Sequence, residues 1–285
     1  MSIESLESIE EYIANDRIEE LRELLSIRVL VSVICDDRTD LINEIYKLLK
    51  TTECIEQKLF TAALESALCI NNNCIIDTLR IISKAKAKQH LEVEDDEYIY
   101  QLSRYPNAIY FFESVFDYKI NFPWEDVLRF SSFHLNNELV YFVLDNIDFN
   151  LDELNLAFVS LLKTNETVPG EDNKTLNELI FRFISEGADV NLETDTDNGN
   201  IYLDCFVYAP TATKFFYTQD FELANLDNDE FWVDFFDDFD IDDDEYMTNY
   251  KQAFYDMKSN GIDVSSLKTK FWDLGYEDLV ERLIG

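Results

Sequence analysis

Apolar residues recur along this chain with the spacing of amphipathic α-helices. Between Ile18 and Leu25 they fall at positions i, i+3, i+6 and i+7, which places them on one stripe of a helix. Asn15 and Asp16 directly precede this stripe and are its predicted N-cap. Segments of the same kind are predicted at 18–25, 41–49, 75–82, 108–116, 139–144, 176–184 and 279–284. Because only six Gly and four Pro interrupt the chain, we expect regular helices with short connections.

The predicted helices recur at a characteristic distance. The last apolar residues of nine successive helices are separated by 24 to 41 residues, on average about 32. These residues are Leu25, Leu49, Ile82, Phe116, Leu144, Ile184, Phe216, Met257 and Ile284. Each interval has room for a second helix, and a lone helix pair cannot bury its apolar face. The pattern predicts an all-α fold, an α-solenoid of about eight or nine helix pairs in one continuous domain over residues 1–285, with the final helix at 280–284.

Three of the helices end in a similar turn. Residues 187–191 read Gly-Ala-Asp-Val-Asn, and Gly187 and Gly261 fit the left-handed position that ends a helix. The stretch 275–284 is similar to the start of the second helix of an ankyrin repeat, and 187–191 match the turn that closes that helix. The chain therefore resembles the ankyrin-repeat family, with degenerate repeats that are clearest at 184–206 and 260–284. The resemblance implies stacked helix pairs and a function in binding other proteins.

The sequence also departs from the family pattern. Ile201-Tyr202 and Asp204 stand where the family has Thr-Pro and His, and the other helix pairs share only periodicity and cap residues. A generic α-solenoid is the alternative. Steps of 40 and 41 residues indicate insertions, and the Pro169-Gly170 pair predicts an insertion loop at 164–173.

Composition narrows the classes of function. With 59 acidic and 23 basic residues the net charge is −36, which opposes direct binding to nucleic acid or to an anionic membrane. A hydrophobic content of 47% excludes a disordered chain. The acidic N-terminus and the lack of an apolar run of about 18 residues predict a cytoplasmic protein without signal peptide or membrane helix. Five cysteines without a C-x-x-C pair predict buried, reduced thiols.

The sequence contains few residues suited to catalysis. The two histidines, His90 and His134, lie near no nucleophile motif, and the six glycines are too widely spaced for a phosphate-binding loop. Carboxylate pairs are inevitable among 59 acidic residues and carry no information about catalysis. We therefore expect a protein that is not an enzyme and that uses neither cofactor nor metal.

The segment 227–245 holds eleven acidic residues and no basic one. Its aromatic residues are spaced to form one buried helix face, with the carboxylates on the other face. These residues are Phe231, Trp232, Phe235, Phe236 and Phe239. A calcium loop starting at Asp238 is the alternative, but Asp243 and Asn249 occupy the positions where an EF-hand needs Gly and Glu.

So many carboxylates repel one another, and stability alone gives no reason to collect them. Residues 101–285 carry 38 acidic and 12 basic residues, so most of the negative charge lies there. Such a field would steer a basic protein partner toward the chain. The predicted partner-binding residues are Asp234, Asp237, Asp238, Asp240, Asp242, Asp243, Asp244 and Glu245.

Two classes of function fit this pattern. In the first, the chain inhibits a basic, nucleic-acid-handling protein, as an immunity protein against a nuclease toxin or as a counter-defence protein that mimics nucleic acid. In the second, it is an ankyrin-like interaction scaffold or effector whose acidity is incidental. The charge concentrated in residues 101–285 favours the inhibitor.

Overall fold

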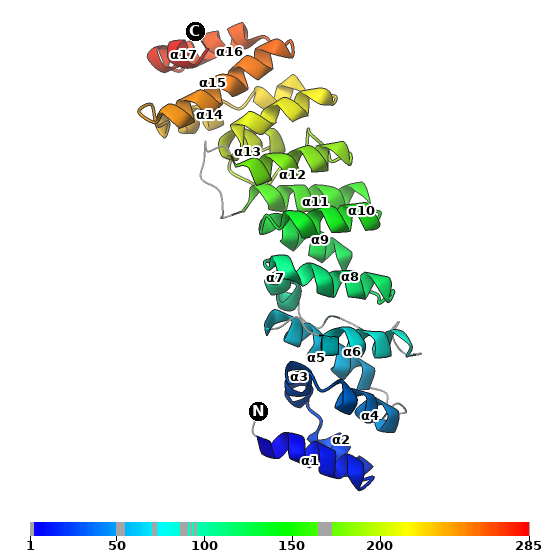
Figure 1. Cartoon of the computed structure of the whole chain (residues 1–285). Helices are drawn as coiled ribbons and strands as arrows, with labels where there is room; N and C mark the ends of the chain where they lie inside the picture. Colours follow the sequence, from blue (N-terminus) through cyan, green and yellow to red (C-terminus); the bar gives the residue numbers. More distant parts are fainter. Residues whose placement is uncertain are drawn as a thin grey trace. The chain divides into compact units, whose positions relative to one another are not determined.

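A computed structural model of the chain describes residues 3–49, 55–69, 73–85, 91, 93, 96–164 and 173–284 (Figure 1). Within these residues there are seventeen α-helices and three 3-10 helices, and no β-strand is formed. One isolated bridge joins Glu193 and Asn200. The all-α class predicted from the sequence is therefore confirmed. No helix in the described part of the chain has the length and apolar character needed to cross a membrane.

The chain forms two compact units. The first comprises Met1–Val127 with Tyr141–Val143, and the second comprises Leu128–Val140 with Leu144–Gly285. We expected a single continuous domain over residues 1–285. Whether the two units stack into one such domain stays a prediction. Most of the predicted insertion loop, residues 165–172, lies outside the described residues.

In the first unit, short helices pack against their neighbours in sequence. Helix α3 packs on α5, α5 on α6, and α6 on both α4 and α8. The ring of Phe122 fills the space beside α8, with edge contacts to Phe60, Phe111 and Phe112. The helices that begin within this unit are α1 (Ile3–Ala14), α2 (Ile18–Leu24), α3 (Ile27–Cys35), α4 (Thr39–Leu49), α5 (Ile55–Cys69), α6 (Asn73–Ser83), α7 (Glu97–Ser103), η2 (Pro106–Ala108), α8 (Ile109–Asp117) and α9 (Trp124–Phe133).

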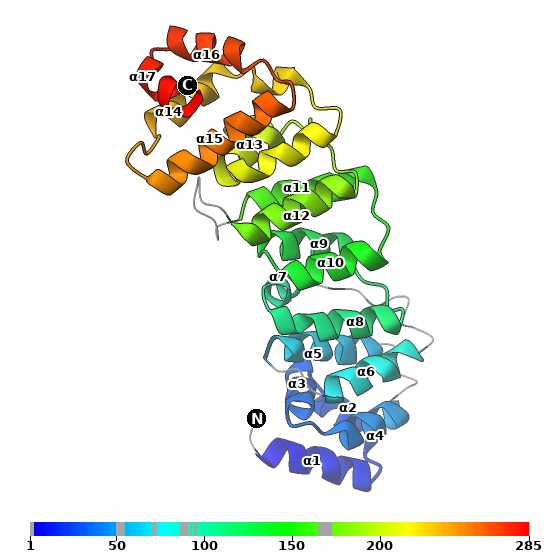
Figure 2. The same ribbon diagram turned by 45° about the horizontal axis from the view of Figure 1, so that its top comes forward.

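In the second unit, a 3-10 helix takes a central place. The helix η3 packs against α12, α13 and α15. Helix α17 packs against α15 and α16 (Figure 2). The helices of this part of the chain are α10 (Asn137–Asn146), α11 (Leu151–Leu162), α12 (Lys174–Ser185), α13 (Ile201–Tyr208), η3 (Pro210–Thr218), η4 (Leu223–Leu226), α14 (Asp229–Asp237), α15 (Asp244–Ser259), α16 (Val264–Asp273) and α17 (Glu277–Ile284). The predicted final helix is thus confirmed as α17.

Some local predictions were wrong. Asp16 lies in the left-handed region (φ 54°), and the side-chain amide of Asn15 donates to the Glu11 carbonyl, so both residues end α1. The N-cap of α2 is Arg17, which forms no side-chain capping bond. The cysteines are also not uniformly buried: Cys74 and Cys205 are, but Cys35 and Cys69 are exposed. Cys54 lies outside the described residues.

The turns after α12 and α15 have the predicted geometry. Gly187 and Gly261 adopt φ values of 95° and 86°, where a Cβ would be strained. Downstream of the first turn, the Asn191 amide donates to the Asp220 carbonyl (2.7 Å) and its oxygen accepts from the Glu222 amide (2.8 Å). This asparagine therefore ties the turn after α12 to the segment that follows η3.

Polar contacts in the second unit recur with two sequence offsets. Three of them join residues 34 apart: Asn155 with the Asp189 amide, Asn177 with Thr211, and Asn191 with Asn225. Three others join residues 43 apart: Tyr250 with the Val207 carbonyl, Tyr276 with the Val233 carbonyl, and Lys270 with Asp227. The offsets are close to the 32- and 41-residue steps between apolar residues in the same part of the sequence.

Replacing Asn191 should destabilise the second unit. The substitution Asn191→Ala leaves the Glu222 amide and the Asp220 carbonyl without this partner, and we expect a loss of about 1–3 kcal/mol in the free energy of unfolding. This loss is measured in urea, with unfolding monitored by tryptophan fluorescence. The control is Asn260→Ala, whose side chain bonds only locally to the Asp256 carbonyl. Equal losses in the two variants would contradict a role for the 34-residue contacts.

Candidate functional site

The eight predicted partner-binding residues lie close together in sequence at the end of α14, in the next turn and at the start of α15. We refer to them as the acidic surface: Asp234, Asp237, Asp238, Asp240, Asp242, Asp243, Asp244 and Glu245. All eight are exposed. Because these side chains are exposed, their charge is presented to solvent.

The aromatic face of α14 holds this surface in place. Four of the five predicted aromatic residues, Phe231, Trp232, Phe235 and Phe236, lie on α14, and Phe239 lies just after the end of the helix instead of on it. All five are less than 10% exposed, and Trp232 is fully buried. The Trp232 indole donates to the Leu226 carbonyl (2.9 Å), and its ring packs against Phe206 and Phe271. Asn228 caps the helix by accepting from the Phe231 amide. The amphipathic helix predicted for this segment is therefore confirmed.

Three residues of the acidic surface have roles in the fold. Asp243 is the N-cap of α15 and accepts from the amides of Glu245 (2.9 Å) and Tyr246 (3.0 Å). Asp240 accepts from the Asp242 amide (3.1 Å), which shapes the turn. Asp237 accepts from the Tyr276 hydroxyl (2.6 Å). Local structure therefore accounts for these three carboxylates.

The charge of the acidic surface is not neutralised by neighbouring cations. None of its eight residues forms a salt bridge with a Lys or Arg in the described part of the chain. In contrast, Lys270 bridges Asp227 (3.0 Å) and Asp229 (2.6 Å) just before it. Arg282 approaches the turn but donates to the Ile241 carbonyl (3.4 Å).

The negative charge of the acidic surface raises the pKa values of two nearby tyrosines. The hydrogen bond to Asp237, with burial and the negative charge of Asp237 and Asp234, raises the pKa of Tyr276 to about 12. Burial raises the pKa of Tyr246, and the carboxylates of Asp240, Asp238 and Asp243 raise it further. Both phenols therefore stay neutral at physiological pH beside a concentration of negative charge.

The turn itself directs its carboxylates toward backbone amides. Asp240 and Asp243 accept from amides of the turn and of α15 rather than converging on one point. Among the residues that the structure describes, no group of three His, Cys, Asp or Glu side chains is arranged to hold a metal ion.

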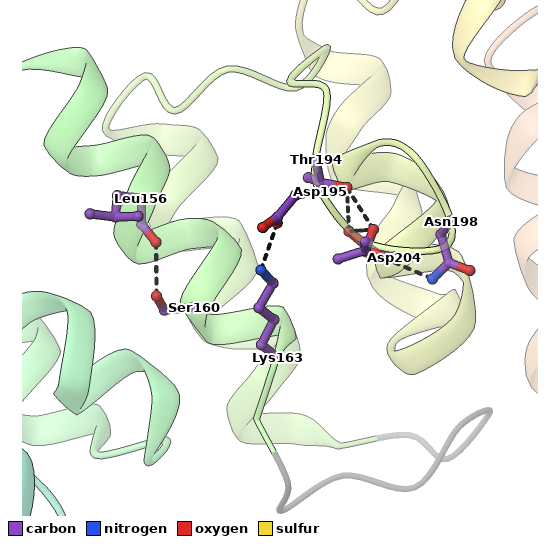
Figure 3. Close-up of polar contacts among 8 residues, drawn as sticks. Leu156, Ser160, Lys163, Thr194, Asp195, Asn198 and Asp204 are labelled. Carbon is purple, nitrogen blue, oxygen red and sulfur yellow. Dashed lines mark hydrogen bonds and ion pairs between the residues drawn. The ribbon is translucent and has the colours of Figure 1, made fainter.

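A second polar cluster in the same unit was not anticipated from the sequence (Figure 3). Asp204 on α13 is only 3% exposed. Its Oδ2 contacts the hydroxyls of Thr194 and Thr196 (both 3.0 Å), and its Oδ1 accepts from the Asn198 amide (2.8 Å). Asp204 thereby holds the loop before α13, and it lines a cavity of about 410 Å³. At the edge of this cavity, Lys163 pairs with Asp195 (2.7 Å).

Burial and hydrogen bonding act on Asp204 in opposite directions. The Thr194 and Thr196 hydroxyls and the Asn198 amide all donate to its carboxylate, which favours the charged form. Burial favours the neutral form and outweighs both these hydrogen bonds and the charge of Lys163, so the pKa of Asp204 is raised.

The Asp204 cluster predicts a pH-dependent stability difference. With a raised pKa, the stability contributed by Asp204 is present below the pKa of unfolded Asp, about 3.9, and is lost as pH rises through the folded pKa. Asp204→Asn cannot titrate. The melting temperature of this variant minus that of the wild type should therefore increase from pH 4 to pH 8 in thermal unfolding scans.

Asp195→Asn is the matched control for this prediction. In the wild type, the hydrogen bond with Lys163 lowers the pKa of Asp195. The stability that Asp195 contributes is therefore lost only as pH falls through that lower pKa. We expect its melting-temperature difference to stay constant between pH 5 and pH 8. A constant difference for Asp204→Asn as well would contradict the raised pKa of Asp204.

Removing the cap of α15 should destabilise the chain without any binding partner. Asp243→Ala leaves the Glu245 and Tyr246 amides uncapped and should cost about 1 kcal/mol of the free energy of unfolding, measured in urea. The neighbouring Asp242→Ala should change it by less than about 0.5 kcal/mol, since it removes only an exposed surface side chain. Equal effects would show that the capping bonds contribute nothing.

No protein-family model, no curated protein and no solved structure matches this chain. Its function is therefore inferred from its own sequence, contacts and charge.

Proposed function

We propose that this chain is a non-catalytic, protein-binding array of ankyrin-like helix pairs. The left-handed Gly187 in the Gly-Ala-Asp-Val-Asn turn supports this assignment. The hydrogen bonds between residues 34 apart support it as well, because a repeating fold places equivalent residues of neighbouring repeats in contact.

The proposed activity is inhibition of a basic, nucleic-acid-handling protein, of the immunity or counter-defence type. The observation that carries this proposal is the charge of the acidic surface, which is exposed and forms no salt bridge with any described Lys or Arg. A surface of closely spaced carboxylates resembles the phosphates of a nucleic acid in charge. It would occupy the positive cleft of such a partner and block access to its substrate.

The fold does not account for all of this charge. The side chains of Asp234, Asp238 and Asp242 are exposed, and none of the three caps a helix or shapes the turn. Asp244 differs from them, because it lies in the first turn of α15, where a negative charge stabilises the helix. Closely spaced like charges repel one another and lower stability. Binding to a basic partner gives these carboxylates a use, and their field would raise the association rate by about tenfold or more at low salt.

The test reverses only the carboxylates that have no structural role. The surface variant is Asp234→Lys, Asp238→Lys and Asp242→Lys, which leaves Asp237, Asp240, Asp243 and Asp244 in place. The control variant reverses three exposed carboxylates of the first unit: Glu11, Glu23 and Asp117. Both variants have the same net charge of −30 instead of −36, so only the position of the change differs.

Each protein, immobilised at the same density, is used to capture proteins that mass spectrometry then quantifies. We expect basic nucleic-acid-handling proteins to bind the wild type and the control variant at about 50 mM NaCl, and to be lost from the surface variant. Raising NaCl to about 500 mM shortens the Debye length to about 4 Å and should weaken the wild-type capture steeply. Equal capture by all three proteins at both salt concentrations would favour the scaffold with incidental acidity.

A further inference from the structure

A groove of the opposite charge lies between α15, the start of α16 and α17. Its volume is about 520 Å³, and its apolar floor includes Phe254, Val264 and Leu283. Three cations line it: Lys251 and Lys258 from α15, and Arg282 from α17. None of its lining residues in the described part of the chain is acidic, although residues 101–285 contain 38 acidic and only 12 basic residues. The groove is therefore a local reversal of the charge of its surroundings.

The fold does not use these three cations in salt bridges. Other basic residues in the same part of the chain are paired: Lys268 with Glu281 (3.0 Å) and Lys270 with Asp227 and Asp229. Lys251, Lys258 and Arg282 form no salt bridge within the described part of the chain, and Arg282 donates to a backbone carbonyl. The ammonium groups of Lys251 and Lys258 are thus available to a ligand, and Arg282 adds positive charge to the groove while one of its nitrogens donates to the Ile241 carbonyl.

An aromatic side chain lies among the cations. Residues 251, 255 and 258 are spaced i, i+4 and i+7 on α15, which places them on one face of the helix. Tyr255 also lines the groove and is 65% exposed, the largest exposed fraction of any large apolar or aromatic side chain in the described ranges. A ligand in the groove would therefore meet positive charge and apolar surface together.

We propose that this groove binds an acidic peptide segment that carries an apolar side chain. Carboxylates of the segment would pair with Lys251, Lys258 and Arg282, while its apolar side chain would lie on Phe254 and Leu283. The net charge of −36 does not prevent this, because at 0.15 M salt the Debye length is about 8 Å and nearby charges dominate. The proposal does not depend on the acidic surface or on its partner.

Fluorescence anisotropy with three labelled hexapeptides tests the ligand chemistry at 150 mM NaCl. The probe is Glu-Asp-Leu-Phe-Asp-Glu. The second peptide replaces its Leu-Phe by Ser-Ser, and the third replaces its four acidic residues by Lys. We expect saturable binding of the probe to the full-length chain, with Kd on the order of 10–100 μM. Both other peptides should bind at least about tenfold more weakly, since each lacks one half of the recognised chemistry.

Two double variants locate the binding. Lys251→Glu with Lys258→Glu should weaken binding of the probe at least about tenfold. The control is Lys174→Glu with Lys214→Glu, which reverses two exposed lysines outside the groove and gives the same net charge. Circular dichroism checks that both variants fold. The control should bind the probe as the wild type does.

Several outcomes would overturn the proposal. No saturable binding of the probe, equal affinity for the Ser-Ser peptide, or equal weakening by the two double variants would each do so. A concentration-dependent dimer in sedimentation velocity that is lost only in Lys251→Glu with Lys258→Glu would assign the groove to a second copy of the chain instead. The assay contains no basic partner, so its failure would leave the proposed inhibition untouched, and the reverse also holds.

Discussion

Burial of aromatic side chains holds together the most negatively charged part of this chain. The ring of Trp232 on α14 contacts Phe206 on α13, Phe254 on α15 and Phe271 on α16, so one side chain joins four helices. Each such ring stabilises the fold by about 1.5–3 kcal/mol when it is fully buried. This gain offsets the repulsion among carboxylates that the same helix presents to solvent. The carboxylates can therefore be concentrated only on its outer face.

This division between faces explains why the sequence predicts part of the structure well. A spacing of 3.6 residues per turn identifies the buried face of α14 and the approximate extents of α4, α12 and α17. This works because the buried face of a helix can be recognised from the residues of that helix alone. Asp16 shows the limit of such reasoning. Its residue type suits either end of a helix, and only the left-handed backbone and the neighbouring Asn15–Glu11 bond show that it ends α1.

Contacts between distant residues could not be predicted in this way. Of the acidic surface, Asp237 is used by Tyr276, which lies 39 residues away, whereas Asp227 and Asp229 are neutralised by Lys270. The contacts of Asp204 could not be predicted either. Its partners Thr194, Thr196 and Asn198 lie in a loop, where no periodicity indicates that their side chains meet a buried carboxyl group. The sequence shows where acidic residues concentrate, and only the tertiary structure shows which of them have a basic side chain as partner.

The few cations of the chain therefore matter more than its total negative charge. Basic residues that are held in salt bridges, such as Arg182 with Asp145 and Lys163 with Asp195, are neutralised by their partners and add little to the field around the chain. Lys251 and Lys258 form no salt bridge among the described residues, and they lie on α15, the helix whose first turn carries Asp244 and Glu245. A partner that is only basic would gain from the carboxylates but meet like charge at this groove. Like-charge contacts discriminate between partners because they penalise the wrong one. Selectivity in this chain would thus come from where its cations are placed, and speed of association from its carboxylates.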